Sequence, residues 1–251
     1  TPYDSNLILE GSDTRRKFLD SLISQFNKSY LDNLIAYNRL LANRNATLKQ
    51  MAERQQFNAD LLSVIDIQLI EKGNFVHAER KQFLKEFIPV FNRFYQEISN
   101  GNESVNLNYS SALNDQPFEQ LLNESINKDR MLTYTSKGIH KDDLDFKIME
   151  DYSLKKFASQ GQQKSFLIAL KLAQFEYIKL KKGFPPILLL DDIFDKLDEN
   201  RVNYILQMIA NNKLGQTFIT DTSLTKTPEI LSKLTVDYQS FEVKEGIVTQ
   251  L

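Results

Sequence analysis

Hydrophobic side chains recur every three or four positions over two long segments in the first part of the chain. The first segment begins at Tyr30 and the second covers residues 75–98, and charged residues separate the apolar positions in both. This spacing is typical of helices that pack against each other. A shorter helix is predicted over residues 14–27. The sequence "KGN" at 72–74 predicts the turn between two antiparallel helices.

The pattern changes after residue 103. The sequences "SVNLNYS" (104–110) and "DLDFKI" (143–148) alternate with period two, which predicts strands, and a helix is predicted between them. Residues 161–182 are apolar on most sides and predict a buried helix. Further elements follow in the order strand (187–190), helix (199–213), strand (216–220) and a hairpin that turns near Glu245 and Gly246.

The later half therefore reads helix–strand–helix–strand, which predicts a parallel α/β core. The mainly helical stretch in the middle of the chain resembles an insertion into that core. We predict three parts: an entry helix (1–29), a helical insertion with a short strand element (30–129) and the rest of the α/β domain (130–251).

Composition limits the possible chemistry. The 251 residues include no cysteine, which excludes disulfides and cysteine-based metal or nucleophile sites. The lack of cysteine agrees with the reducing cytoplasm, where we expect the protein to be. No long uncharged apolar run is present, so we expect no membrane span. The formal net charge of −2 does not fit a simple nucleic-acid binder. The chain begins without Met in a loop-like phrase, so we expect it to be part of a longer protein.

Paired carboxylates follow the most hydrophobic predicted strand, in "ILLLDD" (187–192). Strands of a parallel sheet are buried on both faces, and ligands bind beyond their carboxyl ends. Asp191 and Asp192 would then reach the ligand crevice, where carboxylates suit Mg²⁺. The alternative is that both acids are solvated and cap the next helix.

Two other phrases place polar groups near that edge. In "FASQGQQKS", Ser159, Gly161 and Gln162 stand at the start of the buried helix, whose positive end is a potential phosphate site. An ordinary serine cap is the alternative. In "GQTFITDT", a core strand ends in Thr220 and Asp221, at the same sheet edge as the acidic pair.

These phrases, in this order, resemble the ATPase heads of the ATP-binding-cassette class, in the SMC-like branch that includes the RecF family. "SQGQQ" resembles the signature motif, "ILLLDD" Walker B, "DKLD" (195–198) the D-loop and "FITDT" the switch. "RRKFLDSLISQ", "YLDNLIAYNRLLANRNATLK" and "GIHKDDL" also resemble RecF phrases. The likeness covers nearly the whole chain.

The resemblance implies part of a P-loop ATPase head with a mainly parallel sheet and a helical insertion. It implies ATP and Mg²⁺ bound between two heads arranged head to tail in a homodimer. Asp191 would hold Mg²⁺ through water, and Asp192 would orient or deprotonate the attacking water. The other implied site residues are Ser159, Gly161 and Gln162 at the γ-phosphate bound to the partner chain, Asp198 at the dimer seam, and Asp221 or Thr222 at the switch.

The sequence departs from the family pattern in four places. Transporters of this class have Glu at the position of Asp192. Signature motifs usually have Gly at the position of Gln160, and the switch is usually His, where Asp221 or Thr222 stands. The phosphate-binding sequence G-x-x-x-x-G-K-[ST] is not found in these residues, and "GQQKS" lacks its second glycine. We therefore expect the chain as given to bind ATP poorly and not to hydrolyse it.

The resemblance also implies DNA replication and repair, the SOS response and association with the nucleoid. It implies binding to double-stranded, gapped or junction DNA, with RecO and RecR as partners that help load RecA. Arg15, Arg16, Lys155 and Lys156 are candidates for DNA contact, although solvated surface is the favoured interpretation for each. His140 and Asp142 have no derivable role, and two histidines make a zinc site unexpected.

Other readings remain. A condensin-type head needs hundreds of coiled-coil residues where this chain has about 100. An ATP-driven nuclease of the overcoming-lysogenisation kind needs a nuclease domain. A non-catalytic scaffold that uses the helical part for protein contacts is the alternative from another class.

Overall fold

The computed structural model describes residues 5–149, 151–191, 199–211, 214–222, 229, 231–232 and 237–251. The chain divides into two compact units: unit 2 comprises Asn6–Ile88 and Asn106–Lys147, and unit 1 comprises chiefly Pro89–Val105 and Ile148–Leu251. These bounds differ from the predicted parts because the early helices pack with the long helices of unit 2. The predicted functional division stays a prediction.

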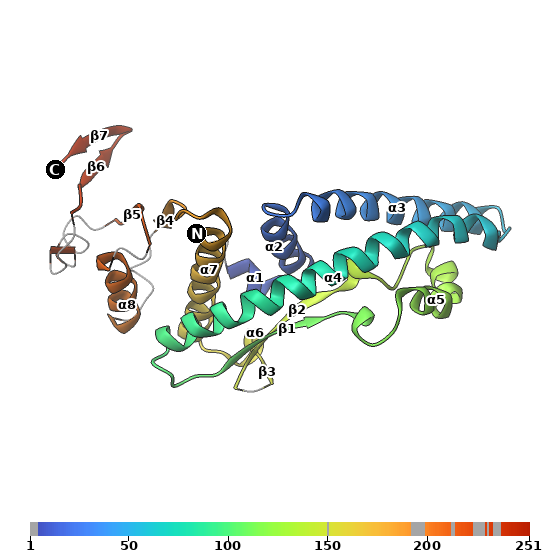
Figure 1. Ribbon diagram of the computed structural model, residues 1–251, viewed down its shortest axis with the longest axis horizontal. Coiled ribbons are helices and arrows are strands. Elements are labelled where there is room, and N and C mark those ends of the chain that lie inside the picture. The colour runs from blue at the N-terminus through green and yellow to red at the C-terminus, as the bar shows by residue number, and fades with distance from the viewer. Residues whose placement is uncertain are drawn as a thin grey trace. The chain divides into compact units, whose positions relative to one another are not determined.

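Long helices dominate unit 2. Its first elements are α1 (Asn6–Leu9), α2 (Ser12–Ser24), α3 (Lys28–Glu53) and α4 (Ala59–Ile98), and α4 continues into unit 1. Figure 1 shows α3 and α4 as neighbouring antiparallel helices. The helical prediction is thus confirmed, but the predicted turn at 72–74 is wrong, because α4 runs through it without interruption.

Gly73 serves close packing and not a turn. A Cβ atom at this position would lie 2.5 Å from Phe118 Cε1 and 3.2 Å from Tyr37 Cε2, so two rings occupy the space of the missing side chain. The chain reverses earlier, where Gln55 adopts a positive φ of 52° and the Asn58 side chain accepts a hydrogen bond from the first turn of α4. Such a side-chain cap fixes a helix start.

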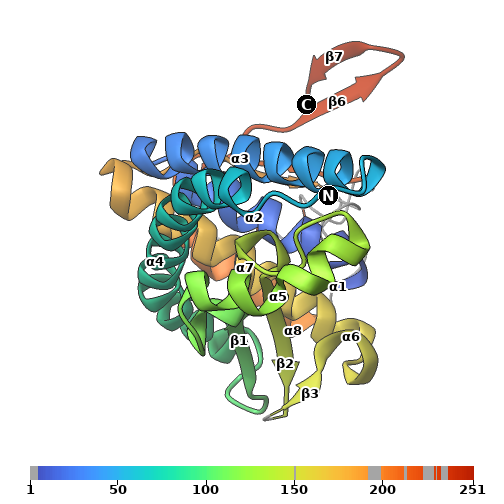
Figure 2. The same cartoon turned by 90° about the vertical axis from the view of Figure 1, so that its right-hand side faces the viewer.

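The remaining elements of unit 2 follow the predicted pattern. They are β1 (Val105–Ser110), the short helix η2 (Ala112–Asn114), α5 (Phe118–Leu132), the short helix η3 (Ile139–Lys141) and β2 (Asp143–Ile148). In β2 every second residue is buried, which confirms the alternation seen in the sequence. Figure 2 shows β1 and β2 side by side, and they are neighbours in one sheet.

The buried stripe of α3 contains a charged residue. Tyr30, Tyr37, Arg44 and Leu48 are its buried positions. Arg44 donates to Asp129 at 2.7 Å, and both side chains are fully buried. A buried ion pair of this kind requires a partner for each charge, so the charge pattern alone did not mark Arg44 as part of the core.

Unit 1 carries the helix–strand–helix–strand order. After the end of α4, unit 1 continues from residue 148 onward. Its elements there are β3 (Tyr152–Ser153), α6 (Leu154–Phe157), α7 (Gln160–Lys182), β4 (Leu188–Asp191), α8 (Glu199–Ala210), β5 (Thr217–Thr220), β6 (Phe241–Lys244) and β7 (Ile247–Gln250). Strands β4 and β5 are parallel, as predicted. Strands β6 and β7 form the predicted antiparallel hairpin, and its turn residues Glu245 and Gly246 both have positive φ, which two-residue hairpin turns favour.

Membrane insertion has no candidate segment in this structure. Within the described ranges, every helix is too short or too polar to cross a bilayer.

Candidate functional site

A capping box holds the start of α7. The Ser159 hydroxyl accepts a hydrogen bond from the backbone N–H of Gln162 at 3.2 Å, and the Gln162 side-chain oxygen accepts one from the backbone N–H of Ser159 at 2.8 Å. This arrangement satisfies two donors that a helix start leaves without an intrahelical partner. The serine cap is therefore confirmed, and the positive end of a 23-residue helix lies at the same point.

Gly161 brings a second helix to this point. A Cβ atom on Gly161 would lie 3.0 Å from Nη1 of Arg201, so the glycine leaves room for the guanidinium group. Arg201 stands in the first turn of α8. The sequence analysis missed Arg201 because no periodicity or motif links it to a residue 40 positions earlier.

Asp191 and Thr220 meet at one edge of the parallel strands. Asp191 ends β4, Thr220 ends β5, and the register pairs the two residues. The Thr220 hydroxyl donates a hydrogen bond to Asp191 Oδ1 at 2.6 Å, and both side chains are exposed. The prediction that polar groups of both strands share this edge is confirmed for this pair, although β4 begins and ends one residue later than predicted.

The oxygen atoms at this edge suit a hydrated Mg²⁺ ion, which prefers oxygen ligands and keeps much of its water shell. Within the part of the chain that the structure describes, no three His, Cys, Asp or Glu residues form a group that could ligate a metal ion. Asp221 follows β5 directly and is half-buried. Asp192 and Asp198 lie outside the described residues.

The prediction that the strand before Asp191 is buried on both faces is wrong. Leu189 is 72% exposed, and Phe218, its neighbour in the register, is 52% exposed. On the opposite face Ile219 packs against a cluster that includes Val202 and Leu206 of α8. Two strands covered on one face bury alternate residues only.

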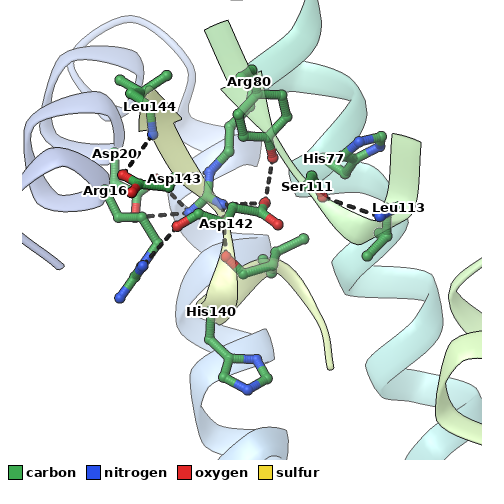
Figure 3. Close-up of polar contacts among 12 residues, drawn as sticks. Arg16, Asp20, His77, Arg80, Ser111, Leu113, His140, Asp142, Asp143 and Leu144 are labelled. Atoms are coloured by element: carbon green, nitrogen blue, oxygen red, sulfur yellow. Dashed lines mark hydrogen bonds and ion pairs between the residues drawn. The ribbon is translucent and has the colours of Figure 1, made fainter. Parts of the chain in front are cut away.

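The phrase Gly138–Leu144, which had no assigned role, places Asp142 in a buried network (Figure 3). Asp142 accepts hydrogen bonds from Arg80 at 2.9 Å and from the Tyr109 hydroxyl. Arg80 also donates to Asp20 at 2.8 Å. Burial raises the pKa of Asp142, and the hydrogen bonds that it accepts counteract this rise. The network joins α2, α4, β1 and the segment before β2, so it holds unit 2 together.

His140 is held in one tautomer. Its Nε2 lies 3.0 Å from the carbonyl oxygen of Thr135, and its Nδ1 lies 2.8 Å from the Tyr37 hydroxyl. A carbonyl oxygen can only accept, so Nε2 carries the hydrogen and Nδ1 accepts from Tyr37. Burial lowers the pKa of His140 to about 4.

This lowered pKa predicts acid sensitivity. In the unfolded chain His140 has an ordinary pKa of about 6.5, so between pH 6.5 and pH 4 it binds a proton that it does not bind in the folded chain. The free energy of unfolding therefore falls as the pH decreases through this range. Between pH 7 and pH 5 the free energy of unfolding is expected to fall by about 2 kcal/mol through His140. Urea denaturation at both pH values measures this loss.

The variant His140→Gln is the matched control, because its amide nitrogen can still donate to Thr135 without titrating. The acid loss should shrink by about the same 2 kcal/mol in this variant. The remaining loss includes a contribution of the same sign from His77, whose pKa burial also lowers. An equal loss in wild type and variant would contradict the assignment.

Two of the basic residues considered for DNA contact are engaged within unit 2. Arg15 donates to both carboxylate oxygens of Asp143, at 2.7 and 2.8 Å. Arg16 donates to a backbone carbonyl oxygen at 2.7 Å. The expectation of a solvated surface is therefore wrong for these two. Lys155–Lys156 in α6 are exposed, as expected.

Known proteins with a similar sequence align with nearly all of this chain. The chain is 52% identical over 243 residues to the DNA replication and repair protein RecF of Flavobacterium johnsoniae, and 46% identical over 253 residues to RecF of Phocaeicola vulgatus. These alignments cover 97% and 100% of the chain and 67% of each relative. The chain thus spans about two thirds of the length of the curated relatives it matches. No protein-family model matches it.

Solved structures with a similar fold point to the same relatives. A structure of the recombination mediator protein RecF with ATP, in the RecFOR pathway, matches all of this chain and 66% of its own, at a TM-score of 0.83 and 33% identity. The Smc head domain of Pyrococcus furiosus matches 99% of this chain and 59% of its own, at a TM-score of 0.51 and 12% identity, which supports the fold alone. The fold is that of an SMC-like ATPase head, and the chain belongs to the RecF family of DNA replication and repair proteins.

Proposed function

We propose that this chain supplies the signature, Walker B, D-loop and switch elements of a RecF-type ATPase that binds ATP and Mg²⁺ between two copies arranged head to tail. The Asp191–Thr220 pair carries the proposal, because it sets a carboxylate at the carboxyl edge of parallel strands. Ligands of such folds bind beyond that edge. The likeness to the RecF structure with ATP supports the choice of nucleotide.

The family pattern then assigns roles to individual residues. Asp191 holds the hydrated Mg²⁺, and Asp192 orients or deprotonates the attacking water. When bound, Mg²⁺ neutralises charge on the phosphate oxygens. The other proposed roles belong to Ser159, Gly161 and Gln162 at the γ-phosphate held by the second copy, Asp198 at the dimer seam and Asp221 at the switch. The 251 residues lack a Walker A sequence, so we propose that they do not hydrolyse ATP by themselves.

The proposed setting is DNA repair in the bacterial cytoplasm. The relatives are named DNA replication and repair proteins, and the solved relative belongs to the RecFOR pathway. On that basis we propose that the full-length protein binds double-stranded or gapped DNA and works with RecO and RecR toward RecA loading. Phosphate contacts make such binding fall steeply with added salt.

Substituting Ser159 tests the proposed contact with the second copy. In the full-length protein, Ser159→Arg places a long cationic side chain at the start of α7. We expect the dissociation constant of the ATP-dependent dimer to rise by a factor on the order of ten or more, while ATP binding to the monomer is unchanged. Analytical ultracentrifugation with Mg-ATP, together with nucleotide titration, measures both quantities.

Ser159→Asn is the matched control, because asparagine also caps helices well and adds no charge. It should dimerise nearly as wild type does. A wild-type protein that stays monomeric in saturating Mg-ATP would refute the proposed dimer. Equal dimer affinity in wild type and Ser159→Arg would remove the start of α7 from the interface.

A further inference from the structure

Glu103 connects the end of α4 to the start of α7. It lies in the segment between α4 and β1, and one of its carboxylate oxygens accepts a hydrogen bond from the Tyr95 hydroxyl at 2.5 Å. The other oxygen accepts a hydrogen bond from the Gln162 side-chain nitrogen at 3.3 Å. Sequence reasoning missed this link, because Glu103 and Gln162 are 59 positions apart and Glu103 belongs to no motif.

The Glu103 carboxylate determines which way the Gln162 amide points. A carboxylate only accepts hydrogen bonds, so the amide nitrogen must face it. The amide oxygen then faces the backbone N–H of Ser159, which is the bond that completes the capping box. If the Gln162 amide were reversed, its oxygen would face the Glu103 carboxylate and its nitrogen would face the backbone N–H of Ser159. Neither pair could then form a hydrogen bond. Glu103 thus favours the capped geometry of the helix start.

The support beneath Glu103 is packed. Tyr95 is fully buried, and its ring lies 6.3 Å from the ring of Phe166 in α7, in an edge-to-face arrangement. Phe91, one turn earlier in α4, makes a closer contact with the same ring, at 4.8 Å. Edge-to-face pairs of this kind add to the stability gained from burial. These ring contacts hold the last turns of α4 against α7, so Glu103 contacts the start of α7 from a well-packed segment.

We propose that Glu103 is a positioning residue for the signature motif: through Gln162 it holds the backbone N–H groups at the start of α7 in the geometry that receives the phosphate bound by the second copy. This role rests on the proposed function, in which that helix start faces a nucleotide. Glu103 touches no reacting atom and acts only through Gln162.

The experiment compares Glu103→Ala with Glu103→Gln in the full-length protein. Alanine removes both hydrogen bonds. Glutamine can restore them, because its oxygen accepts from Gln162 and its nitrogen donates to the Tyr95 oxygen. We expect Glu103→Ala to raise the dissociation constant of the ATP-dependent dimer about tenfold, Glu103→Gln to stay within about threefold of wild type, and ATP affinity of the monomer to be equal in all three.

A second measurement does not depend on nucleotide. Amide hydrogen exchange of residues 158–166 in the nucleotide-free protein should be faster at the start of α7 in Glu103→Ala and near wild type in Glu103→Gln. Tyr95→Phe, which keeps the buried ring and loses only the hydroxyl, should shift exchange in the same direction by a smaller factor. Tyr204→Phe is the control, because it also removes one tyrosine hydroxyl that donates to a glutamate, in this case Glu97 of α4.

The outcomes separate the two proposals. Faster exchange in Glu103→Ala with rescue by glutamine, together with the loss of dimer affinity, supports the positioning role. The same exchange result in a protein whose wild type forms no dimer with ATP would refute the proposed function, and Glu103 would then order the helix start without serving a phosphate. Unchanged exchange and dimer affinity in Glu103→Ala would overturn the positioning role. Equal losses in the alanine and glutamine variants, or a parallel loss of monomer ATP affinity, would overturn it as well.

Discussion

Replacing Asp192 with Asn in the full-length protein is expected to slow ATP hydrolysis by about 10²–10⁴-fold, the usual cost of losing a general base. Asp192 follows directly on Asp191, whose carboxylate stands at the ligand edge of β4. Asparagine keeps the shape of the side chain but cannot take a proton from the attacking water. Steady-state turnover at saturating Mg-ATP measures the effect, and ATP affinity should change little.

Asp237→Asn is the control, because it removes one carboxylate from an exposed position in the same unit. Its turnover should equal that of wild type. A normal rate in Asp192→Asn would exclude this side chain as the base. A loss of ATP binding equal to the loss of rate would instead mean that Asp192 binds the nucleotide or its metal.

Replacing Arg80 with Met is expected to lower the free energy of unfolding by about 3–5 kcal/mol. Arg80 is 1% exposed and donates to Asp20, to Asp142, to the Tyr30 hydroxyl and to a backbone carbonyl oxygen. Methionine fills much of the same volume but leaves the Asp142 carboxylate buried without its cation. Guanidinium denaturation at pH 7 measures the loss.

Lys17→Met is the matched control. Lys17 pairs with Asp13 one turn away on α2, and both side chains are largely exposed. Exposed pairs at this spacing contribute about 0.3–0.5 kcal/mol. A cost of less than about 1 kcal/mol for Arg80→Met would mean that the buried network stabilises these charges little more than hydration does in the unfolded chain.

The sequence was sufficient for most elements of the fold. Alternation in 143–148 correctly predicted β2, and the order of elements in the later half correctly predicted the parallel pair β4 and β5. The turn at Gly73 was wrong because glycine has two uses that sequence alone does not separate: it can end a helix, or it can leave space for a neighbour. Here the neighbour is the Phe118 ring, 45 positions away.

The candidate site was predictable where it depends on local geometry. The Ser159 cap follows from a serine placed three residues before Gln162, and the Asp191–Thr220 contact follows from the shared edge of parallel strands. Arg201 and Glu103 were not predictable, because both reach the start of α7 from distant segments. Arg44 and Arg80 were missed for a related reason, since a charge belongs in a core only when the fold brings its counter-charges to it.

The uncovered face of β4 and β5 has a consequence for handling this chain in solution. Leu189 and Phe218 stand side by side and mostly exposed, so copies of the isolated chain can adhere through them. A net charge of −2 on 251 residues offers little colloidal repulsion against such adhesion. Lowering the ionic strength will not disperse aggregates of this origin. A mild non-ionic detergent will, because it binds the exposed side chains of Leu189 and Phe218 in competition with other copies.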